Sequence, residues 1–149
     1  MSMLPIGSEA PNFKLNDHEG NPHRLSDYDG SWILLYFYPK DDTPGCTKEA
    51  CMLRDSAMEY EKHNIMVVGV SADSEMSHQK FISRYNLPFT LFSDPDKKVI
   101  DLYGAKNEIG GTKRISYLIG PEGVIEKAYA DVKPEIHAEE VLRDVKNLM

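Results

Sequence analysis

The hydrophobic pattern of this chain switches repeatedly between the period of a buried strand and the period of a helix. Residues 32–38 form a continuous apolar run that ends at Pro39 and has the length of a buried strand. Residues 65–70 form a second run of this kind. Between them, from Thr43 to about His63-Asn64, apolar residues recur at steps of three and four, which predicts a helix. Its buried face is expected to carry Cys46, Ala50, Leu53, Ala57 and Tyr60.

Two further helices are predicted from the same period. The helix over residues 74–85 is expected to turn Met76, Phe81, Ile82 and Tyr85 inward. The helix over residues 137–148 is expected to bury Ala138, Val141, Leu142, Val145 and Leu148. The order of strand, helix, strand and helix in the first part of the chain indicates parallel strands that are joined by crossover helices.

The later part of the chain predicts an antiparallel hairpin. Residues 115–119 and 124–129 flank Gly120-Pro121-Glu122-Gly123, whose Pro and final Gly suit a type I turn. The fold class is therefore expected to be α/β, with a thioredoxin-like mixed β-sheet flanked by helices. One domain over residues 1–149 is expected, because a chain of this length buries about 70% of its unfolded surface without disulfides or metal.

Composition narrows the classes of partner and compartment. The hydrophobic content is 41%, and no stretch approaches the roughly 20 apolar residues of a membrane span, so no membrane partner is expected. The net charge of -7 and the lack of a basic run argue against binding to nucleic acid. The N-terminal residues lack the features of a secretory signal, which predicts a cytoplasmic, reducing location. There, two thiols favour a redox or metal role over a static disulfide.

The chain's two cysteines, Cys46 and Cys51, follow the first predicted strand within one short segment. If Thr43 caps the helix, Pro44 takes the first helical position and Cys46 the third, inside the positive first turn. A helix terminus favours a thiolate by at most about 2 kcal/mol, which leaves the thiolate only partly formed. We therefore expect a second activating group near Cys46, namely an Arg from a distant strand.

The spacing of Cys46 and Cys51 predicts motion that is coupled to oxidation. On an intact helix a step of five residues separates the Cα atoms by about 8.6 Å and rotates the side chain by about 140°. A disulfide generally needs a Cα separation below about 7 Å. The two sulfurs can therefore join only if the first turns of the helix unwind, so the pair is interpreted as switchable.

These residues resemble the peroxiredoxin family, specifically its bacterioferritin-comigratory or Q type. Pro39, Thr43 and Cys46 reproduce the Pro-x-x-x-Thr-x-x-Cys signature of that family, and Cys51 stands where this type places its resolving cysteine. The segment around Arg114 is similar to the Arg-bearing strand of the family. The resemblance covers nearly the whole chain, and it extends to the opening Gly7-x-x-Ala10-Pro11-x-Phe13 and to Asp94.

The resemblance implies reduction of a hydroperoxide, either hydrogen peroxide or an organic hydroperoxide, with no cofactor and no metal. Cys46 would become a sulfenic acid, and Cys51 would condense with it to a disulfide that thioredoxin or a similar dithiol reopens. Thr43, Arg114 and the Cys46 backbone N–H are assigned as hydrogen-bond donors to the breaking O–O bond, and Pro39 to packing over the sulfur. A monomer suffices for this chemistry, and the sequence leaves a dimer open.

The sequence departs from the family pattern at residues 107–112 and at Gly120, where an Asp is common. These differences lie outside the residues assigned to catalysis. They affect the expected rim of the pocket, so the sequence does not indicate which hydroperoxide is preferred.

Other functions fit the sequence less well than peroxide reduction does. A disulfide exchanger of thioredoxin type lacks a Cys-x-x-Cys motif, and a redox-sensing binding module would oxidise without turnover. A zinc site is disfavoured because no His pair accompanies the cysteines. The five histidines are interpreted as surface residues. A nucleotide site is excluded because neither glycine-rich phosphate-binding motif occurs. Asp41 and Asp42 are interpreted as solvated loop residues without a catalytic role.

Overall fold

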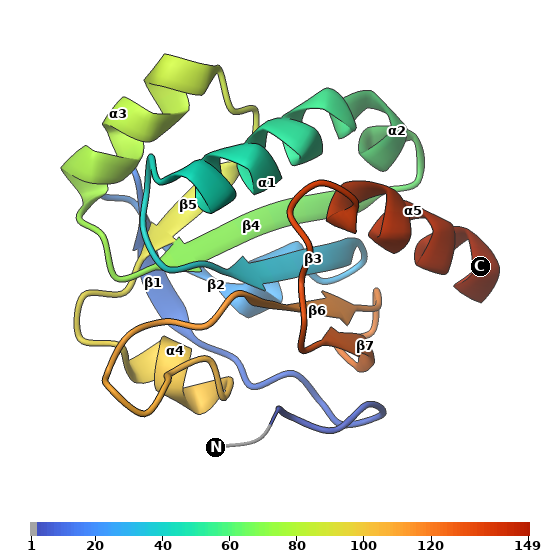
Figure 1. Ribbon diagram of the computed structural model, residues 1–149. Coiled ribbons are helices and arrows are strands. Elements are labelled where there is room, and N and C mark those ends of the chain that lie inside the picture. Colours follow the sequence, from blue (N-terminus) through green and yellow to red (C-terminus); the bar gives the residue numbers. More distant parts are fainter. Residues whose placement is uncertain (1–2) are drawn as a thin grey trace.

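The computed structural model describes residues 3–149, so residues 1 and 2 of the expected domain lie outside the described part. Within residues 3–149 a seven-stranded sheet has the strand order β2-β1-β5-β4-β3-β6-β7 (Figure 1). The elements in chain order are β1 (Lys14–Asp17), β2 (Pro22–Arg24), the 3-10 helix η1 (Leu25–Tyr28), β3 (Trp32–Phe37), α1 (Pro44–Asp55), α2 (Ala57–Lys62), β4 (Ile65–Ser71), α3 (Glu75–Tyr85), β5 (Thr90–Ser93), α4 (Lys98–Leu102), β6 (Ile115–Ile119), β7 (Ile125–Tyr129) and α5 (His137–Leu148).

The sheet is mixed, as the sequence predicts. Strand β3 pairs in parallel with β4, and β4 pairs in parallel with β5. On its other side β3 pairs antiparallel with β6, which forms the predicted hairpin with β7. The turn of this hairpin is closed by a hydrogen bond from the Gly123 N–H to the Gly120 carbonyl at 2.9 Å. Strand β3 therefore lies inside the sheet, which explains its continuous apolar sequence.

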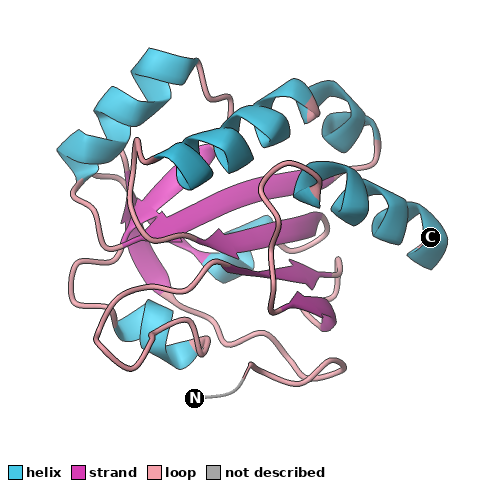
Figure 2. Cartoon of the chain, viewed as in Figure 1, coloured by secondary structure: helices cyan, strands magenta, loops and turns pink. Residues whose placement is uncertain are grey.

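Helices cover both faces of the sheet (Figure 2). Helices α1, α2, α3 and α5 lie over one face, while α4 and the N-terminal segment lie over the other (Figure 1). Side chains of β3 alternate between the two resulting cores: Leu34 and Tyr36 belong to the core beneath α1, and Leu35 and Phe37 to the opposite core. Burial of one such side chain stabilises the fold by about 1.5–3 kcal/mol.

The first predicted helix is interrupted. Helix α1 ends at Asp55 and α2 begins at Ala57, with Ser56 between them. The expected face is otherwise correct, since Cys46, Ala50, Leu53 and Tyr60 are buried. The break leaves α1 as a separate element of 12 residues that contains both cysteines.

In helices α3 and α5, one residue each that was predicted to point inward is exposed. In α3 the buried residues are His78 and Phe81, whereas Met76 is 65% exposed, so its predicted inward position is wrong. Met76 lies in the first turn of α3. In α5 Ala138, Val141 and Val145 are buried as predicted, but Leu148 in the last turn is 40% exposed. Both errors fall in the terminal turns of their helices, where the side chains are exposed.

Several short elements are not indicated by the hydrophobic pattern. The β1–β2 hairpin is polar and largely exposed, and α4 has only five residues. Their pairing partner or packing surface comes from distant parts of the chain: β1, for example, pairs with β5. Among the described helices, none combines the length and the apolar sequence that crossing a bilayer requires.

Candidate active site

Cys46 lies in the first turn of α1 and is 2% exposed. Thr43 occupies the N-cap position, Pro44 follows at the first helical position, and the Thr47 N–H makes the first intrahelical bond, to the Thr43 carbonyl at 2.8 Å. The Cys46 N–H therefore belongs to the group of first-turn donors that have no partner within the helix. This placement agrees with the helix position predicted from the sequence.

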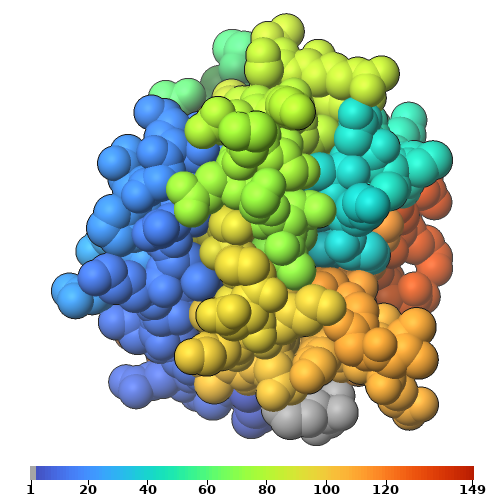
Figure 3. Space-filling model, turned by 90° about the vertical axis from the view of Figure 1, so that its left-hand side faces the viewer, coloured from blue at the N-terminus to red at the C-terminus, as the bar shows by residue number. Residues whose placement is uncertain are grey.

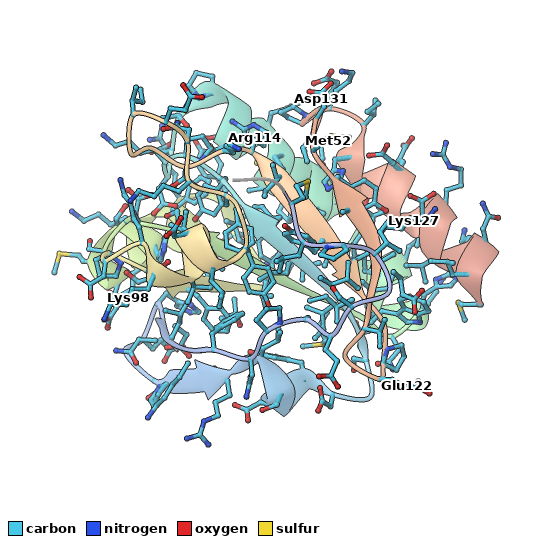
Figure 4. The ribbon with its side chains drawn as sticks, turned by 90° about the horizontal axis from the view of Figure 1, so that it is seen from below. Met52, Lys98, Arg114, Glu122, Lys127 and Asp131 are labelled. Carbon is cyan, nitrogen blue, oxygen red and sulfur yellow. The ribbon has the colours of Figure 1, made fainter. Side chains whose placement is uncertain are left out.

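Arg114 contacts Cys46, although the two residues are 68 positions apart in the sequence. It directly precedes β6, and its Nη2 donates a hydrogen bond to the Cys46 Sγ at 3.4 Å. In Figure 4 the labelled Arg114 lies beside the ribbon of α1. The structure therefore places an Arg from a distant part of the chain beside Cys46, as the sequence predicts.

Gly45 makes room for this contact. A Cβ atom at residue 45 would lie 2.8 Å from the Arg114 Nη2, closer than such atoms approach without displacement. Any side chain here would therefore push the guanidinium away from its neighbours. The sequence signal is a glycine in the first turn of a helix, a costly position that calls for a packing reason.

Glu49 completes the charged cluster and was missed by sequence reasoning. Its Oε1 accepts a hydrogen bond from the Arg114 Nη1 at 2.9 Å, and its side chain is 1% exposed. Burial raises the pKa of Glu49 to about 7, although Arg114 opposes this shift. Its other oxygen, Oε2, is buried without a hydrogen-bond partner. The available signal was its position one helical turn after Cys46, on the face predicted to be buried.

Tyr36 lies in the buried core beside this cluster. Its hydroxyl is buried without a hydrogen-bond partner. Burial raises the pKa of Tyr36 well above its usual range, and the charges of Glu49, Asp41 and Cys46 act in the same direction. The Tyr36 hydroxyl is therefore protonated throughout the physiological pH range.

Thr43 and Pro39 sit on the loop between β3 and α1. The Thr43 hydroxyl makes no capping bond and instead donates to the Lys40 carbonyl at 2.8 Å. Its oxygen lone pairs remain available as acceptors. Pro39 is exposed, so its packing over the sulfur stays a prediction.

Cys51 lies on the same uninterrupted helix as Cys46. Both thiols are free, and Cys51 is partly exposed while Cys46 is buried. On a regular helix their Cα atoms are about 8.6 Å apart, beyond the reach of a disulfide. The structure therefore represents a state in which the two cysteines are kept apart.

Two interpretations of polar residues are wrong. Asp41 is 7% exposed and not solvated, because α3 packs its His78 against the Asp41 carboxylate at 2.7 Å. Among the histidines, His78 and His137 are both 0% exposed and not surface residues. Asp42 does lie at the surface, with a positive φ of 59° and an ion pair to Arg84 at 2.7 Å.

The surface around the site joins three parts of the chain. Figure 3 shows the segment that begins α1, in teal, bordered by the yellow-green segment of α3 and by the orange segment that precedes Arg114. The orange segment includes the loop over residues 105–114, whose tip residue Ile109 is 93% exposed. The rim of the site therefore contains residues 107–112, in which the sequence departs from the family pattern, whereas Gly120 lies in the turn between β6 and β7, so its expected effect on the rim is wrong.

Comparison with known proteins gives consistent relatives. Residues 6–128 match the AhpC/TSA family. A putative peroxiredoxin Bcp from Coxiella burnetii is 46% identical over 146 residues, which cover 93% of this chain and 97% of the relative. A crystal structure of a cysteine-to-serine mutant of PrxQ from Xylella fastidiosa superimposes with a TM-score of 0.93 at 34% identity and covers 99% of both chains. The bacterioferritin comigratory protein of Xanthomonas campestris, whose structures were determined to study alkyl peroxide reduction, gives a TM-score of 0.88 at 32% identity over 91% of both chains.

Proposed function

We propose, from the premise that the chain belongs to the AhpC/TSA family and is a thiol peroxidase of the peroxiredoxin Bcp or Q type, that Cys46 is its peroxidatic cysteine. The observation that carries this assignment is the 3.4 Å hydrogen bond from Arg114 to the Cys46 sulfur. Among the described contacts Cys51 has no hydrogen bond of this kind, and Arg54 acts on it through charge alone. The two thiols are therefore chemically unequal, and Cys46 is the nucleophile.

The first step transfers one oxygen atom to Cys46. The thiolate attacks the distal oxygen of a hydroperoxide, an S–O bond forms, and the O–O bond breaks. Sulfur loses two electrons and the peroxide gains them. The leaving hydroxide or alkoxide takes a proton and departs as water or an alcohol. The cysteine is left as a sulfenic acid.

Three groups support the breaking O–O bond. The Arg114 guanidinium and the Cys46 backbone N–H are donors that face the charge developing on the oxygens. The Thr43 hydroxyl already donates to the Lys40 carbonyl, so toward a hydroperoxide it serves as an acceptor of the peroxide proton. This division of roles orients the peroxide with its protonated oxygen toward Thr43.

The second step joins the two cysteines. The Cys51 thiol attacks the sulfenic acid, an S–S bond forms and water leaves. Because α1 holds the cysteines apart, its first turns unwind before this step. A dithiol of thioredoxin type then attacks the disulfide and returns both thiols through a mixed disulfide. We further propose that the protein is cytoplasmic. We also propose that residues 1–149 form one domain and that this domain is active as a monomer.

The test compares Cys46→Ser with Cys51→Ser in peroxide consumption driven by a thioredoxin system. Cys46→Ser is expected to abolish consumption, whereas Cys51→Ser is expected to consume one equivalent of peroxide per chain and then stop. Intact mass should show one added oxygen in Cys51→Ser. Unimpaired turnover by Cys46→Ser would sink the assignment, and full turnover by Cys51→Ser with thioredoxin would show that Cys51 is dispensable.

The same assay separates the two rival functions. A redox-sensing module would be oxidised by one equivalent of peroxide without repeated turnover. A disulfide exchanger would reduce protein disulfides in the absence of peroxide. The buried, Arg-paired Cys46 favours the peroxidase over the exchanger, because exchange with a protein disulfide requires an accessible sulfur.

A further inference from the structure

A hydrogen-bonded network lies behind the active-site loop and takes no part in the steps above. It centres on Asp41, which is buried although the loop residues on either side of it are exposed. The Asp41 carboxylate accepts hydrogen bonds from the Tyr38 hydroxyl at 2.6 Å and the Ser77 hydroxyl at 2.8 Å. Its backbone N–H donates to the Asp73 carboxylate at 2.8 Å. Backbone and side chain of Asp41 are thus both bonded to groups outside the loop.

His78 of α3 is the deepest member of the network, with 0% exposure. Its Nδ1 lies 2.7 Å from the Asp41 carboxylate and its Nε2 lies 3.1 Å from the Phe92 carbonyl on β5. A carbonyl can only accept, so the Nε2 donates to the Phe92 carbonyl while the Nδ1 faces the Asp41 carboxyl group. The result is a buried, hydrogen-bonded His–Asp pair that spans from the loop to the sheet.

The same cluster has the spacing of a metal site, since single ligand atoms of Asp41, Asp73 and His78 lie within 4.8 Å of one another. Hydrogen bonds already use these atoms. The Asp73 Oδ2 accepts from the Ser71 hydroxyl at 2.7 Å as well as from the Asp41 N–H. The donors around the carboxylates therefore favour a hydrogen-bonded network over a metal centre.

We propose that His78 is a positioning residue for peroxide reduction, which acts by fixing Asp41 and with it the loop that carries Thr43 and leads to Cys46. This inference rests on the proposed function. Asp41 lies two residues before Thr43 and five before Cys46, so a shift at Asp41 moves both groups together. Figure 3 shows α3 directly against the segment that begins α1, as this tether requires.

The tether to α3 has a second, weaker part. Asp42 binds Arg84 at 2.7 Å and accepts from the Tyr85 hydroxyl at 2.8 Å, but the side chains of Arg84 and Asp42 are 65% and 40% exposed. Exposed ion pairs contribute little, whereas removal of one partner from a buried hydrogen bond leaves the other polar group unsatisfied. The Asp41–His78 pair is therefore the part of the tether that determines the position of the loop.

The test uses two substitutions that each keep one half of the imidazole. His78→Asn retains a donor near the Nδ1 position and so retains the bond to Asp41, while His78→Gln retains a donor near the Nε2 position and so retains the bond to β5. The rate of Cys46 oxidation by hydrogen peroxide is measured by rapid quench and intact mass in the Cys51→Ser background, and thermal unfolding is recorded for each protein. We expect His78→Gln to slow oxidation about 10-fold and His78→Asn less than about 3-fold, at similar losses of thermal stability.

His23→Asn is the matched control, because His23 forms another His–Asp contact. His23 lies on the edge strand β2, and its Nε2 is 2.7 Å from the carboxylate of Asp17 on β1. It is expected to lower stability and leave the oxidation rate unchanged. Equal rates in the native protein and both His78 variants, or rate losses that follow stability alone, would refute the positioning role. A Zn²⁺-dependent rise in thermal stability that both His78 variants lose would identify a metal site and overturn it. If the native protein is not oxidised at Cys46 at all, the proposed function itself fails.

Discussion

Arg114 is the residue on which the charge balance at Cys46 depends. Its guanidinium is shared, with one nitrogen on the Cys46 sulfur and another on the Glu49 carboxyl. Glu49 is buried, and its raised pKa of about 7 means that it changes charge near neutral pH. When Glu49 is protonated, the positive charge of Arg114 faces the sulfur alone. Cys46 and Glu49 are therefore coupled through Arg114, which contacts both side chains.

Gly45→Ala is expected to slow Cys46 oxidation by about 10- to 100-fold, because the new Cβ atom would displace the Arg114 guanidinium. Stability should change little, since Ala is the better helix former. Stopped-flow or rapid-quench oxidation by hydrogen peroxide measures the effect. Lys48→Ala, on an exposed position of the same helix, serves as the control. A native rate in Gly45→Ala would show that the position of the guanidinium does not matter.

Glu49 should make the stability of the fold depend on pH. Its pKa is about 7 in the fold and 4.5 in an exposed chain, so the unfolded chain loses its proton first as pH rises. The stabilisation is therefore complete below about pH 4.5 and is lost between about pH 4.5 and 7. In urea unfolding, the loss of stability from pH 5 to pH 8 should be smaller in Glu49→Gln than in the native protein by about 2–3 kcal/mol. Equal pH dependence in both proteins would contradict this assignment.

Helix α1 combines two properties that oppose each other. In the proposed mechanism it is folded to place Cys46 beside Arg114, and it opens to let Cys51 reach the sulfur. Isolated helices of about 12 residues are only marginally stable in water, so α1 depends on its packed face. That face includes the charged Glu49 among the apolar Ala50 and Leu53. The helix is thus held less firmly than an entirely apolar face would hold it.

Lys48→Gly tests whether the opening of α1 limits disulfide formation. Lys48 is exposed and lies between the two cysteines. Gly in a helix costs about 1 kcal/mol relative to Ala, and Lys is close to Ala in helix propensity. The step from sulfenic acid to disulfide should therefore become about 5-fold faster, as measured by quenched-flow mass analysis. Met58→Gly in α2 is the matched control, because Met58 is 75% exposed and lies beyond both cysteines. An equal acceleration in both variants would point to a general loosening of the fold.

Local patterns explain which elements were predictable. Strand β3 and the start of α1 follow from a continuous apolar run and from the Thr43-Pro44 start signal, both of which act within a few residues. The hairpin of β6 and β7 follows from its turn residues for the same reason. Strand β1 was not predictable, because its four residues become a strand only by pairing with β2 and β5.

The candidate site was likewise predictable only in part. Its cysteines were predictable from position and spacing, whereas the role expected of Arg114 came from the family resemblance. Glu49 and His78 were missed because a charged or polar residue on a helix is usually solvated, and only tertiary packing buries these two. Asp41 was misread for this reason too, since its partner His78 lies 37 residues further along the chain.

At the scale of the molecule, the sheet order brings the site together within one chain. The loop after β3 supplies Thr43 and Cys46, and the neighbouring strand β6 begins just after Arg114. Helix α3, which leads into β5, anchors the loop from the other side. All the described site groups therefore come from a single copy of the protein.

Activity per chain is accordingly expected to stay constant on dilution. Peroxide consumption with excess reductant, normalised to chain concentration, should be the same from about 10 μM to about 10 nM, a range that would dissociate weak dimers. Size-exclusion chromatography across the range records the assembly state. A fall in specific activity that coincides with dissociation would show that a second copy completes the site.

The sequence separation between Cys46 and Arg114 has a consequence during synthesis. The two residues are 68 positions apart, and a ribosome adds about 5–20 residues per second, so the thiol is made several seconds before the guanidinium that donates a hydrogen bond to it. Until β6 pairs with β3, Cys46 lacks this hydrogen bond. Under the proposed function, oxidants are therefore expected to react rapidly with Cys46 only after β6 has joined the sheet.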